Sequence, residues 1–251
     1  TNDTIAFDAS LNGTPIVLGG EMDVTRSVTI LGNGATNTVL NGNAYRIFDI
    51  SGSNIEFTLD GLTLQNGHTK DDNERGGAIR STATGATTLS ILNSVLSGNS
   101  TEGQNSEGGA IYTNGGNIVV SNSTLSGNST TGYDAEGGAI STFSGSVAVS
   151  NSSLSGNSTA DDYSQGGAIY TNSGAVTLTN SSLSGNSTTG RRSIGGAVYV
   201  AFNTVTVTNS TLANNSTSGY FSRGGAIHTR DADILITNST FNANSTSGQF
   251  A

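Results

Sequence analysis

The chain has 251 residues, of which 33% are hydrophobic and only 11% charged, and its regularly placed β-branched residues argue against a disordered protein. A formal net charge of −9 argues against a nucleic-acid partner. The lack of cysteine excludes a disulfide scaffold and a thiolate zinc site, and no apolar run approaches the ~20 residues of a membrane span, so we expect no membrane insertion by this segment.

The first 26 residues are the least repetitive part of the chain. Ile5 and Phe7 alternate as in a short strand, Asn12-Gly13 marks a turn, and a second apolar run ends at Gly19-Gly20. We interpret residues 1–26 as an N-terminal cap, because the end of a parallel solenoid exposes unpaired strand groups. Residues 27–75 are expected to form irregular first coils of the same domain.

From residue 76 onward, a glycine pair followed by Ala and Ile or Val begins each unit, and the pairs starting at Gly108 to Gly224 recur every 29 residues. A fixed period of this length is typical of a solenoid. Helices are not expected, since no 3.6-residue apolar period survives the density of Gly, Asn, Ser and Thr. The sequence predicts an all-β parallel solenoid of about eight coils, in which residues 76–251 form the regular coils and further coils follow.

Within each unit, two apolar residues stand two positions apart, as in Ile118 and Val120, and an asparagine follows two positions later. Period two indicates a strand with one buried face. By the same parity we expect the asparagines to point inward and to form a ladder of stacked amides. The expected ladder consists of Asn93, Asn122, Asn151, Asn180, Asn209 and Asn238. The bulky residue three positions further on, such as Leu125, requires a bend in between.

The residue after each Ile or Val of the glycine-pair motif is expected to point outward, one per coil. Flat rings on successive coils could stack on sugar faces and form a glycan-binding strip, although Tyr also simply favours exposed β positions. The residues of this column are Arg80, Tyr112, Ser141, Tyr170, Tyr199 and His228, and all except Ser141 are candidate glycan contacts.

A polysaccharide-degrading β-helix would need carboxylates and a basic residue on one face. The carboxylates here lie mostly in the turns before the glycine pairs, where solvated variable loops explain them, and we assign no catalytic residue. The alternative is a calcium site among Asp71, Asp72, Asp161 and Asp162, and no other cofactor is expected.

Many Asn-Ser-Thr and Asn-Ser-Ser triplets match the sequon for N-glycosylation, for example at Asn122 and Asn128. Half of them belong to the asparagines expected to point inward, which could not carry a glycan. Ladder packing and turn chemistry are therefore the first explanation of these triplets.

The glycine pair with Ala-Ile, together with the Phe241 to Asn244 run that stands as Leu-x-x-Asn in other coils, resembles the paired GGAI and FxxN repeats of the polymorphic outer-membrane proteins. The stretch from Thr4 to Gly42 also resembles the start of secreted bacterial proteins with pectin-lyase-like β-helices. The resemblance implies a right-handed, single-stranded, three-faced parallel β-helix displayed at or beyond the bacterial cell surface.

We therefore expect an extracellular or cell-surface β-helical rod with a structural or adhesive, non-enzymatic role, as part of a longer protein or a filament. The alternative is a carbohydrate-binding or polysaccharide-degrading β-helix, a lyase or a hydrolase. Expected partners are further coils or other copies of the same protein, and surface glycans.

Overall fold

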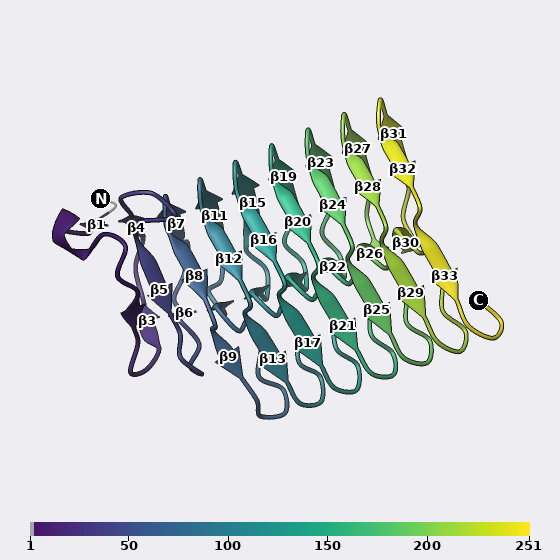
Figure 1. The fold of residues 1–251 in the computed structure, drawn as a ribbon, viewed down its shortest axis with the longest axis horizontal. Coiled ribbons are helices and arrows are strands. Elements are labelled where there is room, and N and C mark those ends of the chain that lie inside the picture. Colours follow the sequence, from purple (N-terminus) through teal and green to yellow (C-terminus); the bar gives the residue numbers. More distant parts are fainter. Residues whose placement is uncertain (1–2) are drawn as a thin grey trace.

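Short runs of hydroxyl-bearing and β-branched residues, interrupted by glycine or asparagine, form short strands that stack along one axis (Figure 1). The computed structural model describes residues 3–251. Each regular coil contributes one strand to each of four parallel sheets, and the coil is right-handed, as the resemblance implies. The predicted all-β solenoid is therefore confirmed, and the only helix among residues 3–251 is the 3-10 turn η1 (Ala9–Leu11).

Sheet A has nine strands, which are β1 (Asp3–Ala6), β4 (Val28–Leu31), β7 (Glu56–Asp60), β11 (Thr88–Leu92), β15 (Asn117–Ser121), β19 (Val147–Ser150), β23 (Val176–Thr179), β27 (Val205–Thr208) and β31 (Ile234–Thr237). Sheet B has nine strands, which are β2 (Ile16–Val17), β5 (Val39–Asn41), β8 (Thr63–Gln65), β12 (Val95–Ser97), β16 (Thr124–Ser126), β20 (Ser153–Ser155), β24 (Ser182–Ser184), β28 (Thr211–Ala213) and β32 (Thr240–Asn242).

Sheet C has eight strands, which are β3 (Met22–Val24), β6 (Phe48–Ile50), β10 (Ile79–Ser81), β14 (Ile111–Thr113), β18 (Ile140–Thr142), β22 (Ile169–Thr171), β26 (Val198–Phe202) and β30 (Ile227–Asp231). Sheet D has seven strands, which are β9 (His68–Thr69), β13 (Ser100–Glu102), β17 (Ser129–Thr131), β21 (Ser158–Ala160), β25 (Ser187–Thr189), β29 (Ser216–Ser218) and β33 (Ser245–Ser247).

A regular coil passes through sheets C, A, B and D in that order and then enters a loop that ends at the next glycine pair. Sheets B and D are separated by only two residues, which in one coil are Gly127 and Asn128. The structure thus has four strand ladders where the resemblance implies three faces. Residues 3–24 supply the first strands of sheets A, B and C, so the segment interpreted as a cap is itself paired with the coil that follows.

The predicted apolar columns form the core. In one coil Ile111, Ile118, Val120 and Leu125 are fully buried, and each lies in register with its equivalent in the next coil. Parallel strands repeat at about 4.8 Å, so these side chains contact one another along the axis. In the last coil, the side chains of Ile234, Ile236 and Phe241 are 40–47% exposed. We still only predict that further coils or another copy of the protein cover these side chains.

The second glycine of each pair is required by a close approach between coils. A Cβ at Gly138 would lie 2.2 Å from the carbonyl oxygen of Gly167 and 2.5 Å from that of Ser158. Both obstacles are backbone atoms, which cannot move aside as a flexible side chain can. The second glycine of the repeated Gly-Gly is thus a steric requirement of the stacked backbones.

The asparagine ladder exists, but the prediction chose the wrong asparagines. Asn122 and its equivalents have φ near 50° and are exposed at the corner between sheets A and B. This left-handed residue ends the alternation of the strand, so its side chain turns outward where parity predicted inward. The same correction applies to the whole expected set, Asn93, Asn122, Asn151, Asn180, Asn209 and Asn238.

The buried ladder is built from the asparagine of Leu-x-x-Asn, between sheets B and D. Asn157 is fully buried, and its Nδ2 donates to the carbonyl oxygen of Leu125 and to Oδ1 of Asn186, both at 3.0 Å. Its Oδ1 accepts from the backbone N–H and Nδ2 of Asn128, each at 3.0 Å. Every polar atom of the Asn157 amide therefore has a hydrogen-bond partner in a neighbouring coil. The members of the buried ladder are Asn99, Asn128, Asn157, Asn186, Asn215 and Asn244.

Replacing Gly138 by Ala should destabilise the protein severely, because the added methyl group meets two carbonyl oxygens. Gly127→Ala is the control, since a Cβ there meets nothing within 4 Å. The control should lose only about 1 kcal/mol of unfolding free energy, because alanine is strained at the positive φ of Gly127. Urea unfolding of both variants measures the difference, and equal losses would contradict the steric explanation.

Asn186→Asp should also destabilise the fold, because a carboxylate would face the carbonyl oxygen of Leu154 where Nδ2 now donates at 3.0 Å. An uncompensated buried charge costs about 3 kcal/mol or more. At roughly 2–4 °C per kcal/mol, the melting temperature should fall by about 6 °C or more. The matched change Asn180→Asp, on the exposed corner, should leave melting nearly unchanged, and a similar fall in both variants would refute the assignment of the ladder.

Candidate functional site

The predicted glycan-contact column is in register along sheet C, but its tyrosines are not available to a glycan. Tyr112 is 3% exposed, Tyr199 is 5% exposed and Tyr170 is 9% exposed. They point away from the core, as predicted, and lie beneath the loops that lead into the glycine pairs. Arg75 covers Tyr112, and Ile194 packs against the Tyr170 and Tyr199 pair.

The other residues of this column show why strand alternation alone wrongly predicted an exposed tyrosine surface. Tyr170 and Tyr199 stack with ring centroids 5.5 Å apart, and His228 continues the stack at 5.8 Å. Burial lowers the pKa of His228, and the positive charge of Arg223 lowers it further. Arg80, also in this column, instead donates two hydrogen bonds to the carboxylate of Asp49. A second layer of loops therefore converts the outer face of sheet C into a buried one, which no two-residue pattern reveals.

Two acidic residues lie side by side under these loops. Glu107 and Glu136 are the residues before successive glycine pairs and are aligned by an isolated parallel bridge. Nη2 of Arg75 lies 2.9 Å from Oε1 of Glu107, and Oγ of Ser141 donates to Oε2 of Glu107 at 3.1 Å. The Glu107 side chain is only 14% exposed.

Their environments raise both pKa values. Burial raises the pKa of Glu107, although the charge of Arg75 opposes it. Burial raises the pKa of Glu136 well above its ordinary value, and the negative charge of Glu107 adds to the effect. A carboxyl group with a raised pKa beside a second carboxylate can act as a general acid. Here, however, both groups are enclosed by their own loops, so we interpret the pair as a structural contact between loops.

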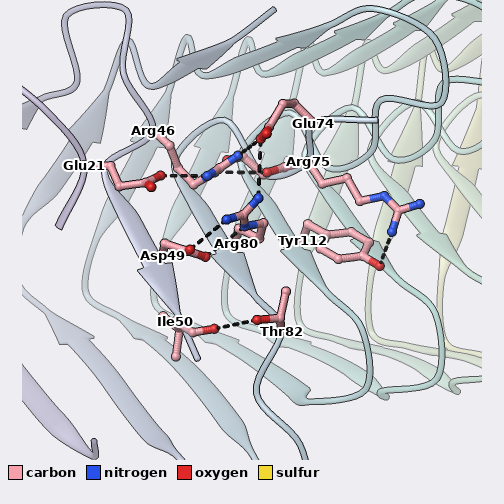
Figure 2. Close-up of polar contacts among 10 residues, drawn as sticks. Glu21, Arg46, Asp49, Ile50, Glu74, Arg75, Arg80, Thr82 and Tyr112 are labelled. Carbon is pink, nitrogen blue, oxygen red and sulfur yellow. Dashed lines mark hydrogen bonds and ion pairs between the residues drawn. The ribbon is translucent and has the colours of Figure 1, made fainter. Parts of the chain in front are cut away.

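The irregular coils are joined to the first regular coil by a cluster of ion pairs (Figure 2). Arg46 is 5% exposed and stands where the regular coils have the second glycine. Its Nε donates to the carbonyl oxygens of Arg75 and Gly76, both at 3.1 Å, and its Nη1 donates to Oε2 of Glu21 at 2.6 Å. Its Nη2 pairs with Glu74. Arg46 thereby connects three successive coils.

Arg80 forms the second part of this cluster. Its Nε and Nη2 donate to the two carboxylate oxygens of Asp49 at 2.8 and 2.7 Å, a bidentate pair. Hydrogen bonding to Arg80 holds the pKa of Asp49 below its usual value. Glu21, Asp23 and Asp49 offer oxygens within 4.8 Å of one another. Both Asp49 oxygens already accept from Arg80, so the cluster is a charge-paired contact between coils.

The calcium residues proposed from the sequence are not brought together. Gly103 stacks on Asp71, Gly132 on Gly103, and Gly190 on Asp161. This order places Asp71 and Asp161 three coils apart, roughly 14 Å at the spacing of parallel strands. One ion could not bind both ends of the set Asp71, Asp72, Asp161 and Asp162, because calcium ligands lie at about 2.3–2.6 Å from the metal.

Exposed and half-buried aromatic rings, together with exposed arginines, follow the outer rim of the loops in the later coils. We call this rim the aromatic edge, and it consists of Tyr133, Tyr163, Arg191, Arg192, Tyr220 and Phe221. The rings of Tyr133 and Tyr163 are 5.2 Å apart, and the Arg192 guanidinium lies 5.3 Å from the centre of the Tyr163 ring. Tyr133 is 48% exposed and Phe221 is 38% exposed.

A hollow of about 390 Å³ adjoins the aromatic edge. It is lined by Arg192, Ile194, Phe221, Arg223 and His228. His228, a predicted glycan contact, therefore does reach a surface depression, although by a different geometry from the one expected. The sequence analysis missed the edge because it considered only the charges of these turns and not their aromatic residues. The recurrence of an aromatic residue close after Ser-Thr-x-Gly or Thr-Ala-Asp-Asp was the available signal.

Comparison with known proteins supports the resemblance in one coil. Residues 151–172 match the model of the Chlamydia polymorphic membrane protein repeat. These residues run from the outward Asn151 through β20 and β21 to the β22 strand, so the match includes the buried Asn157 and one complete glycine pair. The resemblance stated from the sequence is confirmed for this repeat. No curated protein matches the chain.

Residues 3–251 contain no helix that is long and apolar enough to cross a membrane.

The two kinds of carboxylate predict opposite responses to pH. Glu136 has a raised pKa in the folded state, so its contribution to stability is complete below about pH 4.3, the unfolded value, and is lost as pH rises through the folded value. Asp49 has a lowered pKa, so its contribution is present above about pH 3.9 and is lost as pH falls through the folded value. Stability should therefore be highest in mildly acidic solution. Glu136→Gln should flatten the decline toward neutral pH in thermal melts, and an unchanged decline would show that Glu136 is not its source.

Proposed function

We propose that this chain is part of a bacterial surface β-helix that adheres to carbohydrate through the aromatic edge. The match to a membrane-protein repeat and the solenoid fold support the surface role. The observation that carries the adhesive role is the exposure of Tyr133 and Phe221 on the rim where the guanidinium groups of Arg191 and Arg192 lie over aromatic rings.

The chemistry of the edge suits a sugar. Aromatic faces cover the apolar faces of a pyranose ring, while the guanidinium N–H groups donate to hydroxyl or carboxylate oxygens. Arg192 is held over the Tyr163 ring by a 2.9 Å hydrogen bond from Nη1 to the phenol oxygen, so the site is partly preorganised. The adjoining hollow gives a ligand a concave surface as well as a rim.

A non-enzymatic role fits the position of the acidic groups. Burial raises the pKa of three carboxyl groups, and two of them, Glu107 and Glu136, lie under the loops and not on the aromatic edge. Only the third, Asp134, is next to an edge residue, Tyr133. A polysaccharide hydrolase would need two such groups facing the bound glycan. Carbohydrate binding without cleavage is the function that this arrangement supports best.

The test is binding of the purified chain to a glycan array, with and without calcium. The double variant Tyr163→Ala, Phe221→Ala should weaken binding about tenfold or more, equivalent to about 1.4 kcal/mol. Phe143→Ala is the control, because Phe143 is 55% exposed but lies in the turn between sheets C and A. Equal binding by the double variant would refute the edge as the site. Shortening of a bound glycan during incubation would favour the enzymatic alternative.

A further inference from the structure

Two columns of asparagine run along the solenoid, and members of both stand in Asn-Ser-Thr or Asn-Ser-Ser triplets. The outer column, at the corner between sheets A and B, carries such triplets at Asn122, Asn151, Asn180, Asn209 and Asn238. The inner column, between sheets B and D, is the buried amide ladder. The sequence analysis expected the first set to be buried, and the structure places it at the surface.

The inner column cannot be modified in the folded protein. Asn128 is fully buried, and its Nδ2 already donates to the carbonyl oxygen of Leu96 and to Oδ1 of Asn157, both at 3.0 Å. The third residue of its triplet, Thr130, is also fully buried. Neither the nucleophilic nitrogen nor the hydroxyl is within reach of an enzyme.

The outer column has the opposite geometry. Asn122 is exposed with φ 51°, and Thr124 begins β16 with its side chain on the outer face and partly exposed. The amide and the hydroxyl of one triplet therefore face the same side of the molecule. A shallow groove of about 570 Å³ follows the column over four coils, and its lining includes Asn122, Asn151, Asn180 and Asn209.

The fold explains two residues of the outer triplet but not the third. Asparagine is favoured at the left-handed corner. The middle serine is structural, since Ser123 Oγ accepts from the backbone N–H of Ser94 at 3.1 Å and donates to the carbonyl oxygen of Ser121 at 2.8 Å. The third position tolerates an apolar residue, because Val95 occupies it in a coil with the same register. Nothing in the packing requires the hydroxyl that follows in the later coils.

We propose that the outer column is an acceptor array for N-linked glycosylation by an asparagine glycosyltransferase. In each transfer, Nδ2 of the asparagine forms a bond to the anomeric carbon of a sugar activated as a phosphate or diphosphate ester. The bond between that carbon and the phosphate oxygen breaks, the phosphate leaves with the electron pair, and one amide proton passes to a base of the transferase. The substrate class is an activated sugar, and the sites lie on a sheet corner distinct from the aromatic edge.

The experiment is peptide mapping by mass spectrometry of the protein isolated from its source organism. Fragmentation of the peptides should place hexose on Asn122, Asn151, Asn180, Asn209 or Asn238, and the side chains of Asn128, Asn157 and Asn186 should be unmodified. Absence of sugar from the whole outer column would overturn the proposal. Equal modification of both columns would also overturn it, because the folded structure would then not select the sites.

Matched variants test the selection directly on the purified, folded chain, incubated with a soluble asparagine glycosyltransferase and UDP-glucose. Thr124→Val should remove the hexose from Asn122 and leave Asn151 modified. Val95→Thr should create a new acceptor at Asn93, which is exposed but lacks the hydroxyl residue. Both changes lie on the outer face of sheet B, so unchanged melting curves show that the fold is kept. Failure of Val95→Thr to gain sugar while Asn122 is modified would show that the triplet does not define the acceptor.

Discussion

Each coil is bound to the next by the pairing of a residue with its own equivalent 29 positions along the chain. The amide of Asn157 is complete only when Asn128 and Asn186 stand on either side of it. The backbone N–H of Ser123 likewise donates to Oγ of Ser152, its equivalent in the next coil, and the core columns follow the same rule in the register that joins Leu125 to Leu154. A slip of one residue in one coil would break all of these contacts together, so the register is specified many times over.

The stacking of equivalent residues also fixes how closely the backbones of successive coils approach each other. The second glycine of each pair brings the chain so close to the neighbouring coil that even a methyl group is excluded. Where the pattern changes, another interaction replaces it. Arg46 stands at a glycine position in an irregular coil, and it satisfies its charge with Glu21 and Glu74 and its Nε with two backbone carbonyls. The early coils are therefore connected by ion pairs, and the later coils by amides, hydroxyls and close backbone contact.

The loops between sheet D and the glycine pairs differ in sequence from coil to coil. These loops close over the outer face of sheet C, bury its tyrosines and present a different set of side chains on their own rim. The loops carry carboxylates as far as Asp162, aromatic rings begin at Tyr133, and only the loops of the last coils carry Arg191, Arg192 and Arg223, so the rim changes its chemistry along the solenoid. Repeat architecture permits this arrangement, because each loop contacts only its neighbours and can change without disturbing the core.

The sequence alone determined the solenoid, its period and its core columns, because strand periodicity and a repeat of constant length report directly which positions are equivalent and buried. It also identified an asparagine ladder and an aromatic column. It could not say which asparagines form the ladder, because one left-handed residue at Asn122 reverses the direction of its side chain. Nor could it show that Tyr170 is buried, because the loop that covers it packs against the outer face and leaves no trace in strand alternation. Side-chain direction at a corner and burial under a loop depend on contacts between coils, and only the tertiary structure decided them.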